Sequence, residues 1–531
     1  MDIAVDLGAA ALQAPAEAHT AGRGGEWAAP HAIPVPADRD ALAEAIRRIL
    51  EGKHAPPFPA PSPPPDDRFV FSAEDGSNGR ELWVTDGTAE GTSLVRDINP
   101  GAGDAFPFSF PGSFGALGDG RALFGADDGS GGGVELWITD GTGAGTRLVE
   151  DLTTGPFGGD PRSFLPLGDG RALFAAGDAA FGRSLWVSDG TAEGTRLVSP
   201  QTNGRSYIES DFGLLREGEA LVGSFDAGSY VVLRTDGTEA GTRSIKDFGS
   251  AEFSPFGLYP LGDGRLLFRA EEAGSGAGAE LWISDGTEAG TRLVKDLNPG
   301  EGASFPAAYH ALGDGRALFG AFGGTAANGL WITDGTEAGT AFLADVRPVL
   351  GPGGVAGAFA DLGDGRALFL GSDTANGTEL WVTNGTAAGT RLVEDINPGR
   401  DSGAFGIAPL GAGRVLLIGF DGATGIEPWI SDGTAEGTRL LKDVRPGTGP
   451  GSSSDAGGLA PFANGARALF GANDGFHGRE VWITDGTGDG TRLVEDLRPG
   501  AEGSAPGQFV SLGAGDGGRG GMHWHWFDPF G

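Results

Sequence analysis

The sequence predicts an all-β fold, a β-propeller of nine four-stranded blades that the C-terminal strand closes. A glycine-rich motif recurs nine times at a spacing of about fifty residues, which is the length of one propeller blade. Each copy contains four short apolar runs separated by turn residues, and the two ends of the repeated region complement each other. Closing such a ring removes exposed sheet edges that promote aggregation.

The composition agrees with a repetitive β protein and argues against some classes of function. Of the 531 residues, 100 are Gly and 33 are Pro, but the glycines recur at fixed places beside Trp, Leu, Val and Phe, as turns between strands do. The net charge of −35 repels nucleic acid and anionic lipids, and it suits cation binding or a location outside the cell. Without cysteine, the chain has no disulfide or thiolate chemistry.

Residues 1–65 are predicted to be a separate leader, rich in Ala and Pro. One short helix is expected in it, with Leu42, Ile46 and Ile49 on its apolar stripe, followed by an extended proline-rich linker. This leader is either a docking helix or a disordered segment. Acidic residues stand where a secretory signal would be positively charged, and no stretch is apolar enough to cross a bilayer.

Residues 66–513 are predicted to form the propeller. The clearest copy runs from Glu81 to Gly101 and reads E-L-W-V-T-D-G-T-A-E-G-T-S-L-V-R-D-I-N-P-G. The first glycine of the Asp-Gly-Thr turn marks all the copies: Gly87, Gly141, Gly190, Gly237, Gly286, Gly335, Gly385, Gly433 and Gly486.

The interval between the fifth and sixth copies illustrates the four expected strands. They cover residues 291–297, 308–312, 316–320 and 329–333. A Gly-Asp-Gly turn of the hairpin type separates the second from the third, a variable loop separates the third from the fourth, and the Asp-Gly-Thr turn follows the fourth. The longest connection precedes the Leu-Gly-Asp-Gly strand. In a propeller the longest connection leads from the outermost strand to the innermost strand of the next blade, so we expect the Leu-Gly-Asp-Gly strand to be innermost.

The ends of the repeated region predict how the ring closes. The first copy starts at residues 68–71, which match the second strand of a blade, so its innermost strand is missing. Residues 508–513 match that missing strand. The C-terminal strand is therefore expected to complete the first blade.

A tryptophan recurs in the Glu-Leu-Trp strand, and the fourth copy has Leu233 instead. We expect these large rings to pack between blades, and the alternative is an aromatic binding stripe. The tryptophans are Trp83, Trp137, Trp186, Trp282, Trp331, Trp381, Trp429 and Trp482.

The aspartate of the Asp-Gly-Thr turn has two interpretations. Its side chain can cap the turn by accepting backbone N–H groups, and Asn384 in the seventh copy favours this role because it keeps the acceptor without the charge. The alternative is calcium ligation, so calcium is a possible cofactor although none is required. The candidate metal ligands are Asp86, Asp140, Asp189, Asp285, Asp334, Asp432 and Asp485.

These motifs resemble the ELWxxDGT repeat family of bacterial surface and secreted proteins. The resemblance covers about residues 68–512, and only the fourth copy departs strongly, with Val-Val-Leu-Arg in the Glu-Leu-Trp strand. It implies a tandem-repeat protein outside the cell, and it implies no activity and no catalytic residue.

Candidate binding residues lie in the connections that vary between copies. Invariant turns serve the scaffold, whereas variable loops on a rigid frame usually carry recognition. We therefore expect a ligand on the face of these loops or at the mouth of the channel, and the alternative is that the loops are unconstrained. The candidates are Phe106, Phe108, Phe110, Asp127, Asp128, Phe157, Tyr207, Glu271, Glu272 and Asp373.

The predicted function is a non-catalytic binding scaffold at the cell surface or outside the cell, with a carbohydrate or a surface protein as partner. No zinc-protease, P-loop or serine-hydrolase motif is present. Two alternatives remain, a polysaccharide lyase or hydrolase at the channel mouth and a structural component of a surface layer or matrix, with calcium as a possible stabiliser. Nucleic acid and membrane insertion are not expected, and the oligomeric state is open.

Residues 514–531 are predicted to be a tail rich in glycine and aromatic residues. Such a tail, together with the missing N-terminal signal, suggests one-step (type I) export without a cleaved signal.

Overall fold

The computed structural model describes residues 68–100, 104–105, 114–153, 158–178, 182–199, 207–324, 328–349, 359–448 and 450–513. The chain divides into two units, Met1–Ser62 and Pro63–Gly531, and every described residue belongs to the second. The predicted leader and tail lie outside the described residues, so their interpretations stay predictions.

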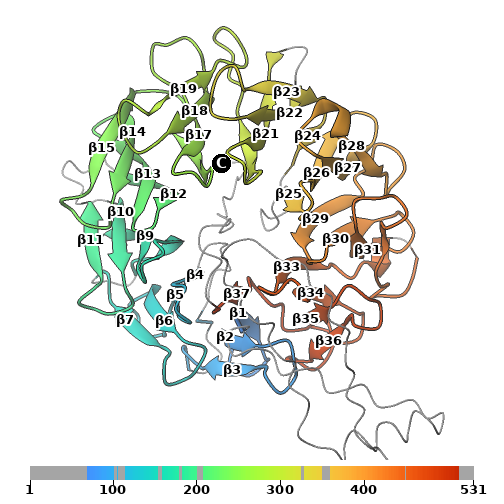
Figure 1. Ribbon diagram of the computed structural model, residues 1–531. Coiled ribbons are helices and arrows are strands. Elements are labelled where there is room, and N and C mark those ends of the chain that lie inside the picture. Colours follow the sequence, from blue (N-terminus) through green and yellow to red (C-terminus); the bar gives the residue numbers. More distant parts are fainter. Residues whose placement is uncertain are drawn as a thin grey trace, which may run out of the picture. The chain divides into compact units, whose positions relative to one another are not determined.

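Nine antiparallel sheets follow one another around a ring, which confirms the predicted nine-bladed β-propeller (Figure 1). The first strands of successive blades are neighbours around the centre, so the Leu-Gly-Asp-Gly strand is innermost as predicted.

Each of the first three blades consists of four strands, which are named from the centre outward. The first has β37 (Val510–Ser511), β1 (Phe69–Glu74), β2 (Arg80–Thr85) and β3 (Ser93–Arg96). The second has β4 (Phe114–Ala116), β5 (Ala122–Ala126), β6 (Glu135–Thr139) and β7 (Arg147–Glu150). The third has β8 (Arg162–Pro166), β9 (Ala172–Asp178), β10 (Gly182–Ser188) and β11 (Arg196–Ser199).

The next three blades include the fourth, whose innermost strand is unusually long. The fourth has β12 (Tyr207–Arg216), β13 (Glu219–Asp226), β14 (Ser229–Thr235) and β15 (Arg243–Gly249). The fifth has β16 (Phe256–Pro260), β17 (Leu266–Ala270), β18 (Glu280–Ser284) and β19 (Arg292–Lys295). The sixth has β20 (Ala307–Ala311), β21 (Ala317–Phe322), β22 (Asn328–Thr333) and β23 (Ala341–Ala344).

The seventh blade differs because two short strands share its inner edge. These are β24 (Arg347–Pro348) and β25 (Phe359–Asp361), and both pair with β26 (Ala367–Asp373), which β27 (Gly377–Thr383) and β28 (Arg391–Glu394) follow. The eighth has β29 (Ala404–Pro409), β30 (Val415–Phe420), β31 (Ile426–Ser431) and β32 (Arg439–Leu440). The ninth has β33 (Gly457–Pro461), β34 (Ala468–Asn473), β35 (Arg479–Thr484) and β36 (Arg492–Glu495). Two 3-10 turns, η3 (Ala387–Gly389) and η4 (Pro450–Ser452), lie between strands.

The ring closes through the C-terminal strand. Strand β37 pairs antiparallel with β1, with Ser511 opposite Phe69 and Val510 opposite Val70. Leu512 extends the pairing through its N–H to the carbonyl of Arg68 at 2.8 Å. The predicted completion of the first blade is confirmed.

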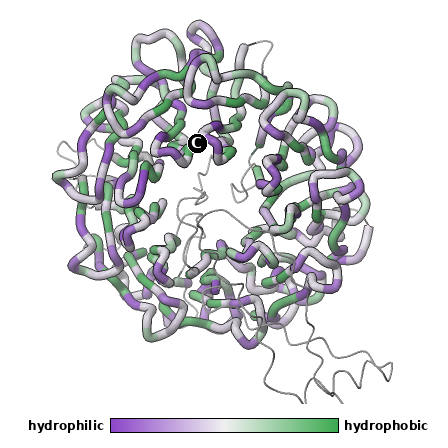
Figure 2. The backbone as a smooth tube through the Cα atoms, in the orientation of Figure 1, coloured by the Kyte–Doolittle hydropathy of each residue, from purple (hydrophilic) through white to green (hydrophobic). Residues whose placement is uncertain are grey.

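The hydrophobic core consists of clusters shared by neighbouring blades. Val70 and Leu82 of the first blade pack with Phe124 and Trp137 of the second, and Trp137 is only 4% exposed. Figure 2 shows hydrophobic stretches alternating with hydrophilic turns around the ring. The repeated tryptophans thus serve packing between blades, which the sequence had favoured over a binding stripe.

No helix of the described residues has the length and hydropathy to cross a membrane.

Candidate functional site

The Asp-Gly-Thr turn uses its aspartate as a hydrogen-bond acceptor. In the fifth blade, Oδ1 of Asp285 accepts the backbone N–H of Thr287 at 2.9 Å and the hydroxyl of the same residue at 2.6 Å. Asn384 makes the same two bonds with its amide oxygen. The other predicted metal ligands also cap their turns: Asp86, Asp140, Asp189, Asp334, Asp432 and Asp485. Calcium ligation by these aspartates stays a prediction.

The second glycine of the motif is required because the capping carboxylate packs directly on it. A Cβ added at Gly290 would lie 2.0 Å from Oδ1 of Asp285, well inside van der Waals contact. The first glycine, Gly286, has a φ of 83°, which residues with a Cβ rarely adopt. The turn therefore tolerates little change, which explains why it repeats almost unaltered.

Arginines of the Gly-Asp-Gly turns join each blade to the next. Arg265 pairs with Asp263 of its own turn and donates from Nη1 to the carbonyl of Asp334, in the next blade, at 3.1 Å. The same connection runs from Arg121 to Asp189. Both kinds of invariant turn therefore lie on one face of the ring, and their polar groups serve the scaffold.

The predicted binding residues of the variable loops are distributed over several blades. Asp127 and Asp128 each accept a backbone N–H two residues on, at 2.9 Å, and Asp373 does the same for Ala375. Their carboxylates thus shape their own loops.

The two glutamates of the fifth blade also have partners within the chain. Glu271 accepts the N–H groups of Glu252 and Phe253, and Glu272 forms an ion pair with Lys246. The structure does not bring these residues together with Asp127, Asp128 or Asp373.

The predicted aromatic candidates cannot be placed. Phe106, Phe108, Phe110 and Phe157 lie outside the described residues, and Tyr207 begins β12 with a side chain that also lies outside them.

A different set of carboxylates lies buried on the opposite face from the invariant turns. The glutamate that opens the Glu-Leu-Trp strand is at most 5% exposed in six blades: Glu81, Glu135, Glu280, Glu379, Glu427 and Glu480. The third, fourth and sixth blades have Ser184, Val231 and Gly329 instead. The sequence interpretation missed these glutamates because it treated the Glu-Leu-Trp run only as a core strand. The available signal was a charged residue recurring at the start of a fully buried strand.

Each buried glutamate holds the segment that crosses to the next blade. In the fifth blade, Oε2 of Glu280 accepts the N–H of Leu297 at 2.8 Å, and Oε1 accepts the N–H of Ser304 at 2.9 Å. Glu135 makes the corresponding pair of bonds to Leu152 and Gly159. An ionised carboxylate accepts hydrogen bonds but cannot donate one. Because the N–H partners of these glutamates can only donate, these hydrogen bonds favour the charged form of the glutamate.

An aspartate near the end of the outermost strand completes the site. It directly precedes the residue whose N–H the glutamate accepts, as Asp296 precedes Leu297. In five blades its Oδ1 is buried and has no hydrogen-bond partner among the described residues: Asp97, Asp296, Asp395, Asp443 and Asp496.

The exposure of this aspartate differs between most blades with the glutamate and the blades without it. The fourth and sixth blades lack the glutamate, and their aspartates, Asp247 and Asp345, are exposed. Where the glutamate is present, the aspartate usually turns an unpaired oxygen inward, although Asp151 of the second blade stays exposed. Protonation of one carboxyl or a bound positive charge relieves the repulsion between two like charges placed together in this way.

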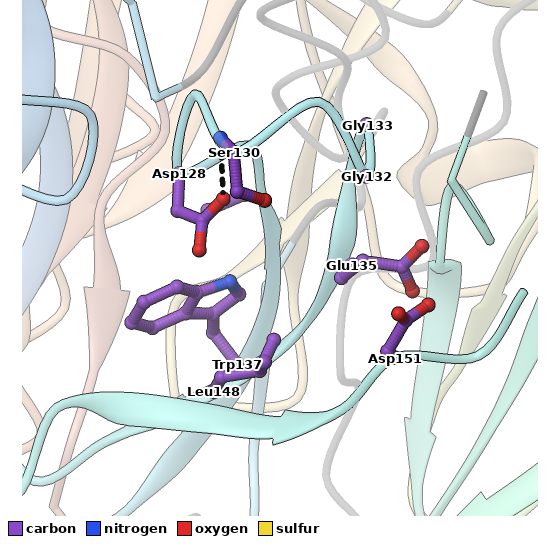
Figure 3. Close-up of a pocket in the computed structure, with 9 residues that line it drawn as sticks. Asp128, Ser130, Gly132, Gly133, Glu135, Trp137, Leu148 and Asp151 are labelled. Carbon is purple, nitrogen blue, oxygen red and sulfur yellow. Dashed lines mark hydrogen bonds between the residues drawn. The ribbon is translucent and has the colours of Figure 1, made fainter. Parts of the chain in front are cut away.

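The second blade shows the site most openly, as a cavity of about 40 Å³ between the strands and the crossing loop (Figure 3). Asp128, Glu135 and Asp151 line it together with Trp137, and the carboxylates of Glu135 and Asp151 point toward one another. One water needs about 10–15 Å³ of such space, so the cavity admits an ion with a few waters. It is far too small for a sugar or a peptide, which need roughly 300 Å³ or more.

Burial and a neighbouring negative charge both make these glutamates harder to ionise. Burial, together with the charge of the neighbouring aspartate, raises the pKa of Glu81, Glu280, Glu379 and Glu427 to about 7, although hydrogen bonds to these carboxylates lower it. The pKa of Glu135 is also raised to about 7, by burial first and then by Asp151 and Asp128. A bound cation would favour the ionised pair.

The chemistry of the donor set fits a hard cation. Carboxylate and carbonyl oxygens with water are the ligands that Ca²⁺ prefers. No three His, Cys, Asp or Glu side chains among the described residues are placed to hold a metal. An ion at one pair would therefore take its remaining ligands from backbone carbonyls and water.

No family model and no curated protein matches the chain. The resemblance to the ELWxxDGT repeat family therefore stays a prediction.

Several solved structures are similar to the chain at low sequence identity. A puromycin hydrolase variant is 17% identical with a TM-score of 0.40, over 69% of this chain and 58% of that one. Dihydro-heme d1 dehydrogenase NirN is 14% identical with a TM-score of 0.40, over 90% of this chain and 87% of that one. The β-propeller domain of the Trilobed protease from Pyrococcus furiosus is 11% identical with a TM-score of 0.31, over 62% of this chain and 92% of that one.

These structures correct the predicted function. The names of these proteins are those of a hydrolase, a dehydrogenase and a protease, and not of carbohydrate- or surface-protein-binding scaffolds. The chain spans 58% of the puromycin hydrolase, and a similarity this low assigns no activity to the chain. The predicted non-catalytic binding scaffold is therefore not retained.

Proposed function

We propose that this chain is a divalent-cation-binding β-propeller, in which calcium binds at the Glu–Asp pairs of six blades and fixes the crossing segments. One observation carries the proposal. In five of the six blades that have the glutamate, the aspartate turns inward a buried oxygen without a partner among the described residues, as at Asp296. The aspartate is exposed in the second blade, at Asp151, and in the fourth and sixth blades, which lack the glutamate.

The choice of calcium rests on the ligand chemistry and on the charge of the chain. Oxygen donors and flexible coordination are typical of Ca²⁺, whereas Mg²⁺ demands a stricter octahedron and keeps more of its waters. The net charge of −35 raises the local concentration of any cation. Sites with only two carboxylates bind weakly, and sites of about 10⁻⁴–10⁻³ M fill outside the cell. An extracellular location is therefore part of the proposal.

Equilibrium dialysis against calcium tests the proposal. We expect about six ions per chain, with the Glu280→Gln variant losing one. The Asp285→Asn variant is the matched control, because Asp285 belongs to the turn of the same blade, and it should lose none. Binding of no calcium would overturn the proposal, and loss of an ion only in the Asp285 variant would move the sites to the turns.

A further inference from the structure

The closing segment, residues 496–513, completes the first blade without a turn that joins its inner strand to the next strand of the blade. In the third blade, by contrast, the inner strand β8 continues through a short turn into β9. Strand β37, within the closing segment, pairs with β1 from the start of the propeller sequence, and their ladder covers only two residues of each strand (Figure 1). The closing segment therefore depends on further non-covalent contacts to stay in place at the seam, where the first and ninth blades meet.

An arginine of the first blade holds the closing segment from one side. Arg80, at the start of β2, donates from Nη1 to the carbonyl of Ala505 at 2.9 Å, and its side chain is only 12% exposed. Next to this bond, the N–H of Glu74 at the end of β1 donates to the carbonyl of Ser504 at 2.9 Å. The first blade thus binds two successive carbonyls of the closing segment.

An arginine of the ninth blade holds the next residue of the segment. Arg479, at the start of β35, donates from Nη1 to the carbonyl of Pro506 at 3.0 Å. The same guanidinium reaches the carbonyls of Asp455 and Gly457, in its own blade, at 3.4 Å. Burial lowers the pKa of Arg479, and hydrogen bonds in such surroundings are stronger than those exposed to water. Arg479 therefore connects the ninth blade to the strand that completes the first.

The position of these two arginines is not basic throughout the repeat. The residue before the glutamate of the Glu-Leu-Trp strand is an arginine in the first, third and ninth blades. The third blade apart, this arginine therefore occurs in the two blades that flank the seam. The other six blades have residues without a guanidinium: Val134, Tyr230, Ala279, Asn328, Thr378 and Ile426.

Arg183 of the third blade offers a matched arrangement away from the seam. It donates from Nη1 to the carbonyl of Asp160 at 3.2 Å, as Arg80 does to Ala505. Both acceptors have a positive φ, 44° at Asp160 and 46° at Ala505, so the two arginines hold the same bend of the repeat. Strand β8, which follows Asp160, is joined to β9 by the chain itself, so the loss of Arg183 leaves the inner strand attached to its blade.

We propose that Arg80 and Arg479 form a lock on the closing segment, and that releasing this lock opens the ring at the first blade. Glu480 holds the segment by the N–H of Ser504 at 2.7 Å, as other buried glutamates hold theirs, and the two arginines add the contacts that replace a covalent turn. Without them β37 leaves and the inner edge of β1 is exposed, while blades with a continuous chain keep their inner strands. The lock needs no cation, so it is independent of the proposed function.

Hydrogen exchange measured by mass spectrometry tests the inference on the full chain. Peptides covering residues 69–74 and 508–513 are followed in the wild type, in Arg80→Ala, in Arg479→Ala and in the double variant. We expect each single substitution to speed exchange in both peptides, and the double variant to speed it on the order of tenfold or more. Both peptides should respond together, because β37 and β1 protect each other's backbone N–H groups.

Two controls distinguish a lock at the seam from a general loss of stability. Arg183→Ala removes the equivalent bond in the third blade, and exchange in residues 69–74 and 508–513 should then match the wild type. A peptide covering residues 280–284, in the fifth blade, should exchange at the wild-type rate in every variant. Unchanged exchange at the seam in the double variant would overturn the inference. Equal acceleration by Arg183→Ala, or in the fifth blade, would also overturn it.

Discussion

The aspartate of the Asp-Gly-Thr turn illustrates how a charged residue can serve a repeat mainly through hydrogen bonds. Asp285 and Asn384 occupy equivalent positions and accept the same two hydrogen bonds from a threonine. What the position needs is an acceptor oxygen two residues before the donor, and the charge adds little at this exposed turn.

This role predicts a specific pair of mutational effects. Asp285→Asn should change the free energy of unfolding by less than about 0.5 kcal/mol, whereas Asp285→Ala should lower it by about 1 kcal/mol because the turn loses its cap. Urea denaturation measures both. Equal losses in the two variants would show that the charge matters, as a bound cation at the turn would require.

The buried glutamates predict a second residue-level effect, on the pH dependence of stability. Their folded pKa of about 7 lies above the usual value of 4.5, so without calcium the folded state holds protons that the unfolded state releases. The glutamates therefore contribute most to the stability of the folded state below about pH 4.5. This contribution is lost as the pH rises through about 7. Calcium binds the ionised form, so its stabilising effect should grow over the same range.

Thermal melts between about pH 5 and pH 8, in chelator and in calcium, check this dependence. His477 changes in the same direction, because Asp474 holds its pKa above the usual value, so a His477→Asn variant serves as the control. A melting temperature in chelator that rises between about pH 6 and pH 8 would contradict the account.

At the scale of the element, most of the fold could be predicted because turns and strands are local. The strand expected over residues 329–333 is β22, Asn328–Thr333, and the one expected over 316–320 is β21, Ala317–Phe322. The closing strand was also predicted, because residues 508–513 match the strand that the first copy lacks.

The candidate site could not be predicted in the same way. Glu280 and Ser304 are 24 residues apart, and the residues directly before Ser304 vary from copy to copy, so no local pattern reveals their contact. The variable-loop carboxylates, such as Asp128 and Glu271, were named for their position alone, and their loops use them as caps and anchors. The split inner edge of the seventh blade also had no sequence signal.

The arginines that connect neighbouring blades are expected to contribute to the free energy of unfolding. Arg265→Ala removes both the pair with Asp263 and the bond to the carbonyl of Asp334, so it should lower the free energy of unfolding by about 1 kcal/mol. Arg265→Lys keeps the charge but cannot make both contacts at once, and should recover only part of this loss. Full recovery in the lysine variant would show that charge, and not the fork of donors, joins the blades.

At the scale of the whole molecule, the two faces of the ring carry different stabilising contacts. One face carries the invariant turns, whose capped aspartates and arginine bridges fix each blade to the next. The other carries the crossing segments, which buried glutamates hold through hydrogen bonds, as Glu280 holds Leu297 and Ser304. Under the proposed function, the invariant turns and the cation sites lie on separate faces, so the repeat can keep its turns constant while six of its nine blades carry a complete carboxylate pair.

The most direct test is a crystal structure determined with calcium present, with anomalous difference density used to locate the ions. The account predicts density between the glutamate and the aspartate of the six paired blades, as at Glu280 and Asp296, and none at the corresponding places of the third, fourth and sixth. Pairs without density, or density at the Asp-Gly-Thr turns instead, would contradict it.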